Sequence, residues 1–259
     1  MQGGIACSVA LLGVVACATV PYTHRSQLIL ISQAEEAQLG AQAFAEATAE
    51  RRVVRGTRAA QQVEDVGRRL AAVSGRSDFQ WQFALLDGKE VNAFAVPGGK
   101  TAVYAGLLPV AQDTSGLAVV MSHEIAHAIA RHGAERLSQG TLVGLGGVVV
   151  GTAAGRNAGL ATDAYGLASQ LGVMLPFSRG QEGEADRIGL ILMARAGYDP
   201  RAALAFWDRM EAQRRGGAPV EFLSTHPDYA TRRALIDAAM PEALQYYAVA
   251  RRAPVEPLN

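Results

Sequence analysis

The hydrophobic positions of the chain follow two different periods, and together they predict a mainly helical protein with one small sheet. In most segments apolar residues recur every three or four positions, which is typical of amphipathic helices. These segments run over residues 33–50, 63–73, 115–137, 178–196, 199–215 and 226–241. Alternating or continuous apolar runs predict strands over residues 79–83, 91–96 and 101–104. The predicted fold class is α+β, with a small antiparallel sheet in an otherwise helical chain.

Local sequence signals mark where several of these helices begin and end. Polar capping residues, two of them followed three positions later by Glu or Gln, favour helix starts. They predict starts at Ser32, Ser178, Asp199 and His226, and Pro241 is expected to end the last helix.

The first twenty residues carry no charge, and the first charged side chain is Arg25. The apolar stretch over residues 5–20 has the length of a signal-peptide core and is short for a membrane span. It ends in Val-Val-Ala-Cys, which resembles the lipobox of bacterial lipoproteins. We therefore predict a signal peptide over residues 1–16 and a lipid on Cys17, with an uncleaved anchor helix or a buried segment as the alternatives. Signal peptides usually start with Lys or Arg, and none is present here, which leaves the true start codon open.

Cleavage at this position would leave residues 17–259 as a single domain, tethered by lipid outside the cytoplasm. Ala18 follows the lipobox cysteine, where lipoproteins retained in the inner membrane of enteric bacteria carry Asp. We therefore expect attachment to the outer membrane, on the periplasmic side.

The composition narrows the possible chemistry. The 24 basic residues are balanced by 24 acidic ones, and a chain without a basic excess is not expected to bind nucleic acid as its main partner. The two cysteines are Cys7 and Cys17, so the rest of the chain is free of thiols. This excludes a disulfide framework, a cysteine zinc ribbon and a cysteine nucleophile there. A metal site must use Asp, Glu and the five histidines.

The main candidate for such a site is His123-Glu124-Ile125-Ala126-His127. On a helix, residues four apart share one face, so His123 and His127 can direct their imidazoles at one metal ion. Glu124 lies about 100° around the helix from His123 and can reach a water on the metal. Apolar residues flank the motif, as expected for a buried site. The pattern predicts hydrolysis by a metal-activated water with Glu124 as the base.

Catalytic zinc usually takes three protein ligands, and the best region for the third is the acidic start of the helix after Ser178. Glu182 and Asp186 share a face, so if Glu182 binds zinc, Asp186 can accept a hydrogen bond from a ligand imidazole. Glu184 is turned about 200° from Glu182 and is the second candidate, or a solvated residue of the helix start. His132 falls on the face opposite His123 of a continuous helix, so we expect it to be a surface residue and no ligand.

His226 is expected at the start of a helix, where the dipole favours a neutral imidazole. There it can donate a hydrogen bond to a tetrahedral oxyanion, or it can bind the zinc as a fourth ligand and block the site. A helix cap without a catalytic role is the simpler alternative. His24 is expected to be a bystander.

Together these stretches resemble peptidase family M48, the zinc metallopeptidases that include the CAAX prenyl proteases. The resemblance is strongest to the bacterial periplasmic members and extends over residues 22–240. The matching stretches are residues 92–99 (NAFAVPGG), 122–132 (SHEIAHAIARH), 178–179, 182–189 (EGEADRIG), 196–200 (AGYDP) and 224–227, with Arg232.

The resemblance implies a mainly helical zincin of the gluzincin type, with one zinc ion. It makes Glu182 the third ligand, Glu124 the catalytic base and Asp186 the supporting acid, and it places His226 near the metal. It also implies that the strand at residues 92–96 lines the cleft, with Asn92, Ala93 and Phe94 as substrate-binding residues. An extended peptide can add to such an edge by main-chain hydrogen bonds. Periplasmic relatives with a helical repeat domain after the catalytic one differ from this chain, which ends before such a domain.

We therefore expect a zinc-dependent endopeptidase, tethered by lipid, that cleaves unfolded or misassembled envelope proteins. The apolar region at residues 141–175 and the loop of His226 are expected to restrict access. One alternative is a zinc-containing, chaperone-like module that holds unfolded chains with little cleavage. Another is a hydrolase that uses the same zinc on a substrate other than a peptide.

Overall fold

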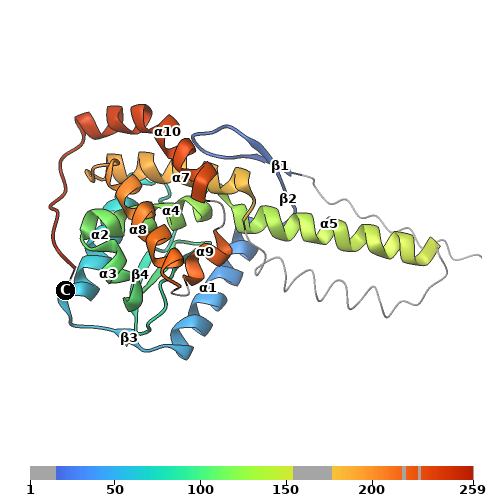
Figure 1. Ribbon diagram of the computed structural model, residues 1–259. Coiled ribbons are helices and arrows are strands. Elements are labelled where there is room, and N and C mark those ends of the chain that lie inside the picture. Colours follow the sequence, from blue (N-terminus) through green and yellow to red (C-terminus); the bar gives the residue numbers. More distant parts are fainter. Residues whose placement is uncertain (1–15, 154–176, 218–219, 227–228, 259) are drawn as a thin grey trace, which may run out of the picture.

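The computed structural model describes residues 16–153, 177–217, 220–226 and 229–258 (Figure 1). It is mainly helical with two small sheets, which confirms the α+β fold class. The strands are β1 (Ala16–Thr19), β2 (Ser26–Ile29), β3 (Val53–Val54), β4 (Gln82–Leu86), β5 (Ala93–Val96) and β6 (Lys100–Tyr104). The helices are α1 (Gln33–Glu50), α2 (Arg58–Val73), α3 (Leu108–Ala111), α4 (Thr114–Ala130), α5 (His132–Ala153), α7 (Arg179–Arg195), α8 (Ala202–Arg215), α9 (Glu221–Thr225) and α10 (Tyr229–Val249), with a 3-10 turn at Ala105–Leu107.

The larger sheet has the strand order β3-β4-β6-β5. We expected an antiparallel sheet, and this was wrong for one pair, because β4 and β6 run parallel. The chain leaves β4, forms the edge strand β5, turns at Gly98 and Gly99, and returns through β6 between β4 and β5. Both glycines have positive φ, 86° and 94°, which other residues rarely adopt. The turn thus places β5 at the edge of the sheet.

Both faces of this sheet are covered. On one face Leu85 and Val103 belong to the main core, which also includes residues of α2, α4, α7 and α8. On the other face Leu86 and Ala102 form a smaller core with Phe44 of α1. Successive residues of a strand point to opposite faces, which explains why β4 and β6 are largely apolar rather than strictly alternating.

Two predicted helix starts are confirmed, and the later helices differ from the prediction. Ser32 and Ser178 are the caps of complete capping boxes at α1 and α7. Helix α8 begins three residues after Asp199, and Asp199 instead accepts bonds in the preceding turn. Pro241 does not end the last helix but lies inside α10. An interior proline costs about 3 kcal/mol, and the helix is nevertheless packed on either side of it through the buried residues Ile236 and Ala243.

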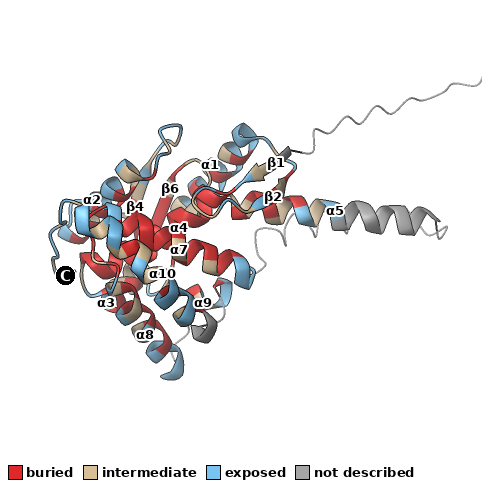
Figure 2. Cartoon of the chain, turned by 90° about the horizontal axis from the view of Figure 1, so that it is seen from above, coloured by how far each residue is buried: buried red, intermediate tan, exposed pale blue. Residues whose placement is uncertain are grey.

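The predicted helix over residues 115–137 is two helices, and this changes the site. Helix α4 ends at Ala130, Arg131 adopts the left-handed conformation with φ 59°, and α5 starts at His132. Helix α4 is buried along its whole length, whereas α5 extends away from the body of the protein (Figures 1 and 2). The side chains after Arg131 therefore do not lie on the faces that a continuation of α4 would give them.

The N-terminal hairpin is formed by β1 and β2, in which Cys17 pairs with Leu28. The predicted signal peptide lies outside the described residues except for Ala16. Of the apolar region at residues 141–175, α5 includes the part up to Ala153, and the rest is also outside the described residues. Among the helices that are described, none combines the length and the apolarity needed to cross a membrane.

Candidate metal centre

The site is built where α7 crosses α4. His123, Glu124 and His127 come from α4 and are 2–4% exposed, and Glu182 of α7 faces them. The crossing is close because Gly189 of α7 has no side chain, and a Cβ there would lie 3.1 Å from the backbone nitrogen of His123. Close packing of the two helices thus brings the acidic start of α7 onto the histidine face of α4.

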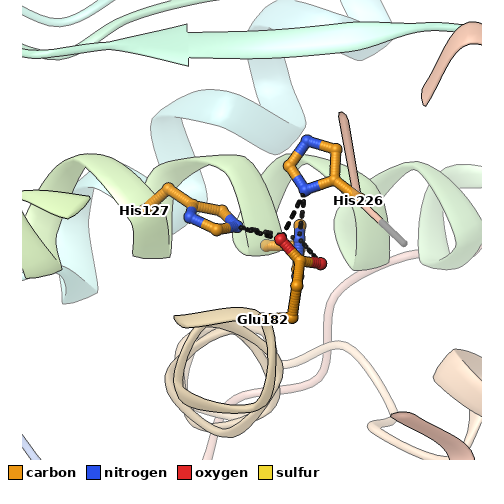
Figure 3. Close-up of side chains that lie close together, drawn as sticks. His127, Glu182 and His226 are labelled. Atoms are coloured by element: carbon orange, nitrogen blue, oxygen red, sulfur yellow. Dashed lines mark hydrogen bonds and ion pairs between the residues drawn. The ribbon is translucent and has the colours of Figure 1, made fainter. Parts of the chain in front are cut away.

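Four ligand atoms converge at this crossing, one each from His123, His127, Glu182 and His226, and all lie within 4.8 Å of one another. His127 Nε2 is 3.1 Å from His123 Nε2. His127 and His226 both point toward Glu182 (Figure 3), and His226 Nδ1 is 2.9 Å from Glu182 Oε1. All four side chains are buried. Three imidazoles and one carboxylate at this separation are a donor set that suits zinc in a tetrahedral site.

Burial keeps this donor set in the protonation states that bind a metal. It lowers the pKa of His123 and His127 well below the usual value, so both imidazoles are neutral. Burial opposes ionisation of Glu182, but the contacts with the neighbouring imidazoles of His127 and His226 overcome it and lower the pKa of that carboxyl group. Neutral imidazoles and an ionised carboxylate are the forms that metal ligation requires.

The side chains that support His123 come from α7 and α10. Its Nδ1 lies 3.0 Å from Asp186 Oδ1, which is the place that the sequence predicted for Asp186. Arg232 of α10 donates to Asp186 Oδ2 and Glu182 Oε2, both at 2.7 Å, and its guanidinium stacks over Trp207. Burial raises the pKa of Asp186 to about 6, and Arg232 opposes this shift. Asp186 and Arg232 thus form a buried ion pair behind the ligand.

His127 is supported from the other side, by a residue that we expected at the surface. That expectation was wrong, because His132 is fully buried and its Nδ1 lies 2.9 Å from His127 Nδ1. Its Nε2 lies 2.9 Å from Glu184 Oε2. The left-handed residue Arg131 starts a new helix direction and turns His132 back toward the site. The alternative of a solvated Glu184 is also wrong, because this side chain is buried beneath the N-terminal hairpin.

His226 reaches the site from a different backbone position than predicted. It is the C-cap of the short helix α9, and the described part of α10 begins three residues later at Tyr229. Its ring stacks on Phe222 with centroids 4.2 Å apart, and on Phe177 at 5.2 Å. Burial between these rings lowers its pKa. The imidazole is therefore neutral, and its Nδ1 faces the other three ligands.

Glu124 lies beside the four ligands without being one of them. Its Oε1 is buried, has no hydrogen-bond partner among the described residues, and lies 3.5 Å from His226 Nε2. Burial raises the pKa of Glu124 well above its usual value, the charge of Glu182 adds to this, and the backbone N–H of Ala95 on β5 opposes it. A carboxylate with a raised pKa is suited to take up a proton.

The three predicted substrate-binding residues lie at or just before β5. Asn92 accepts a hydrogen bond from the backbone of Ala93 through its side chain, and Ala93 is buried in the main core. Phe94 is half-buried against Phe44 and Tyr104 on the opposite face of the sheet. Ala93 is thus buried and the other two side chains are half-buried, and a role of the three residues in substrate binding stays a prediction.

Comparison with known proteins agrees with this geometry. The model of peptidase family M48 matches residues 57–239, which include all four ligands and Glu124. The chain belongs to peptidase family M48. Members of this family are zinc-dependent metallopeptidases, and the three histidines and Glu182 fit that metal.

Curated relatives of this M48 chain are named proteases. Mitochondrial metalloendopeptidase OMA1 of Schizosaccharomyces pombe is 40% identical over 189 residues, which covers 70% of this chain and 53% of the relative. Human OMA1 is 36% identical over 182 residues, with 67% and 35% covered. The beta-barrel assembly-enhancing protease of Escherichia coli is 34% identical over 174 residues, with 64% and 36% covered. The chain thus spans about half or less of the length of these relatives.

Proposed function

We propose that this M48 chain is a zinc-dependent endopeptidase. The observation that carries the proposal is the position of Glu124, whose buried Oε1 accepts no hydrogen bond from the described residues and lies beside four converging ligand atoms. A structural zinc site has no use for such a carboxylate, because an unpaired buried oxygen costs stability. It is useful where a proton has to be taken up and returned.

The roles of the chain's own residues follow from this arrangement. Bound zinc would lower the pKa of a water molecule and polarise the scissile carbonyl group. Glu124 takes the proton of the attacking water, for which its raised pKa prepares it, and returns the proton to the leaving amine. Asp186 and His132 hold the rings of His123 and His127. His226 either occupies the fourth position or, once displaced, stabilises the oxyanion.

The substrate that we propose is an extended stretch of polypeptide bound along β5. This strand is the edge of the sheet, so the outer side of its backbone is not paired with another strand of that sheet. The backbone of Ala95 also lies close enough to Glu124 to influence its pKa. A peptide added to this edge would run past the catalytic carboxylate. Only an unfolded or misassembled protein offers such a segment, which favours a role in proteolytic quality control.

The cellular setting of this proposal comes from the N-terminal sequence. A lipid on Cys17 would place the peptidase on the periplasmic side of the envelope, attached to the outer membrane and acting on envelope proteins. Mass spectrometry of the protein isolated from its native membrane tests this directly. A mature chain that begins at an acylated Cys17 is the expected result, and an unmodified chain that retains residues 1–16 would contradict it.

A holding function with little cleavage is the second candidate. His226 supports it, because its ring already lies among the other three ligands and would fill the position that water needs. In that case unfolded chains would bind along β5 and be released intact.

Casein cleavage by the wild type and by Glu124→Gln, with zinc content measured for both, tests the proposal. Glu124→Gln keeps the shape of the side chain and removes the base. Equal zinc content with at least a hundredfold loss of cleavage is expected, in the range for general-base catalysis. Zinc-loaded wild type that binds casein and does not cleave it would favour the holding function. Full cleavage by Glu124→Gln would contradict the assignment of Glu124.

A further inference from the structure

His132 has no place in the predicted chemistry, yet it is fully buried and contacts a ligand of the proposed zinc site. We propose that His132 is a positioning residue that, fixed by Glu184 and Arg25, holds His127 in the tautomer that binds zinc through Nε2. The inference rests on the proposed zinc site, and it adds the N-terminal hairpin to the parts of the protein that build this site.

The direction of each hydrogen bond from Glu184 through His132 to His127 is set by the charge of Glu184. Glu184 pairs with Arg25 and is therefore an ionised carboxylate, which only accepts hydrogen bonds. His132 must then donate from Nε2, and with its single proton there, as the proposal has it, its Nδ1 can only accept. His127 must therefore carry its proton on Nδ1, 2.9 Å from His132 Nδ1. This leaves the lone pair of His127 Nε2 free for the metal.

The proposal requires that His132 donates to Glu184 only, because a second hydrogen bond donated to His127 would prevent metal binding. If His132 were protonated on both nitrogens, it would donate to His127 Nδ1. The proton of a neutral His127 would then be on Nε2, the atom that lies among the other ligand atoms. A neutral His132 with its proton on Nε2 is thus the form compatible with the zinc site.

At Glu184 this series of hydrogen bonds meets side chains from three elements, the N-terminal hairpin, α5 and α7. Thr23 and Arg25, in the turn of the N-terminal hairpin, both donate to Glu184. Arg25 also donates two hydrogen bonds to Glu135 of α5, at 2.6 and 2.8 Å. Glu135 accepts another from Gln181 of α7 at 2.8 Å. The hairpin therefore fixes Glu184 in the orientation that His132 needs, and does so through residues that touch no metal ligand.

The test measures zinc affinity of the full chain by competition with a chromophoric chelator. His132→Leu removes both hydrogen-bonding atoms at similar size and should weaken zinc binding about ten- to a hundredfold, as loss of such supporting contacts does at other sites. His132→Gln should recover most of this, because its amide oxygen accepts and its amide nitrogen donates. Zinc affinity of His132→Leu within threefold of the wild type would overturn the proposal, as would equal weakening by both variants.

Glu184→Ala tests whether the contact of Glu184 with His132 contributes to zinc binding, with Glu211→Ala as the matched control. Glu211 is equally buried (6% side-chain exposure) and also paired with arginine, but it lies on α8 away from the ligands. Glu184→Ala should weaken zinc binding, and Glu211→Ala should not. Because His132 and Glu184 act as one unit, the double variant with His132→Leu should bind zinc no more weakly than His132→Leu alone. Additive losses would contradict a single chain of hydrogen bonds.

A measurement on the wild type keeps the proposal testable if a variant fails to fold. Nitrogen-15 NMR of the histidine rings in the zinc-loaded protein should find His132 neutral, with its proton on Nε2. A proton on Nδ1, or an imidazolium, would overturn the proposal. Neither readout depends on proteolysis, so a wild type that binds zinc and cleaves nothing would contradict the proposed function and leave these results interpretable.

Discussion

The two histidines of α4 are one turn apart and chemically equivalent, yet two different sets of residues support them. Behind His123 lie Asp186 and Arg232, an ion pair whose side chains are 3% and 2% exposed. Behind His127 a series of hydrogen bonds runs through His132 and Glu184 and ends at Arg25, whose side chain is 37% exposed. The first support is a compact part of the core, and the second reaches the surface through the N-terminal hairpin. We infer that the first fixes the fold around the site and that the second can be perturbed from outside.

The largest effect is expected from Asp186→Ala. This change leaves the buried Arg232 with one carboxylate instead of two and takes the acceptor from His123 Nδ1. Breaking a buried ion pair costs about 3–5 kcal/mol, and urea unfolding of the zinc-free protein should measure this loss. Asp208→Ala, in a pair that is nearly half exposed, is the control and should cost below about 1 kcal/mol. A loss for Asp186→Ala no larger than for Glu184→Ala would remove the difference between the two supports.

An intermediate effect is expected from His226→Ala, because the packing of His226 depends on Phe222 and Phe177 more than on either support. If His226 fills the fourth position, its removal should weaken zinc binding at least about tenfold, or 1.4 kcal/mol. Casein cleavage at saturating zinc should then rise, because water gains access. The exposed His24, changed to Ala, should alter neither quantity. A fall in cleavage at full zinc occupancy would instead make His226 the oxyanion donor.

The smallest effect is a pH dependence of the support behind His127. Burial opposes ionisation of Glu184, but hydrogen bonds from His132, Arg25 and Thr23 lower its pKa from 4.5 to about 2. A carboxyl group whose pKa is lower in the folded state stabilises the fold above its unfolded pKa and loses this contribution as the pH falls. The difference in unfolding free energy between the zinc-free wild type and Glu184→Gln should therefore be full above pH 4.5 and shrink toward pH 2. Urea unfolding at pH 6.5 and 3.5 measures it, and a constant difference would contradict the assignment.

The sequence predicted the compact support well because its parts lie within single helices. His123 and His127 are four apart on α4, as are Glu182 and Asp186 on α7, and helical spacing alone places each pair on one face. Apolar flanks around the histidine motif, a body free of thiols and only five histidines in the chain left few alternatives. The position of Asp186 against His123 therefore follows from the spacing once the two helices are packed together.

The support behind His127 could not be predicted in this way, because it depends on a helix break at Arg131, which is neither glycine nor proline. Arg131 adopts the left-handed conformation, and its side chain donates to Glu36 and to the carbonyl of Ile31 at the start of α1. These contacts join segments about a hundred residues apart in the chain. Hydrophobic periodicity describes only local structure, so His132 was assigned to the wrong face.

The sheet and His226 differ from their predictions for the same kind of reason. Parallel pairing of β4 with β6 arises because β6 inserts between β4 and β5, which is a matter of strand order and not of local pattern. His226 is a C-cap because α9 precedes it, and this five-residue helix is too short to give a periodic signal. In both cases the surroundings of the residues are set by tertiary contacts.

The central claim is that the two separately supported histidines, Glu182 and His226 form one zinc centre. Zinc X-ray absorption spectroscopy of the loaded wild type tests it most directly. The account predicts one zinc per chain, with three imidazole nitrogens at about 2.0–2.1 Å and carboxylate oxygen in the first shell, and with one imidazole lost in His226→Ala. A first shell that contains sulfur, or fewer than two imidazoles, would contradict it.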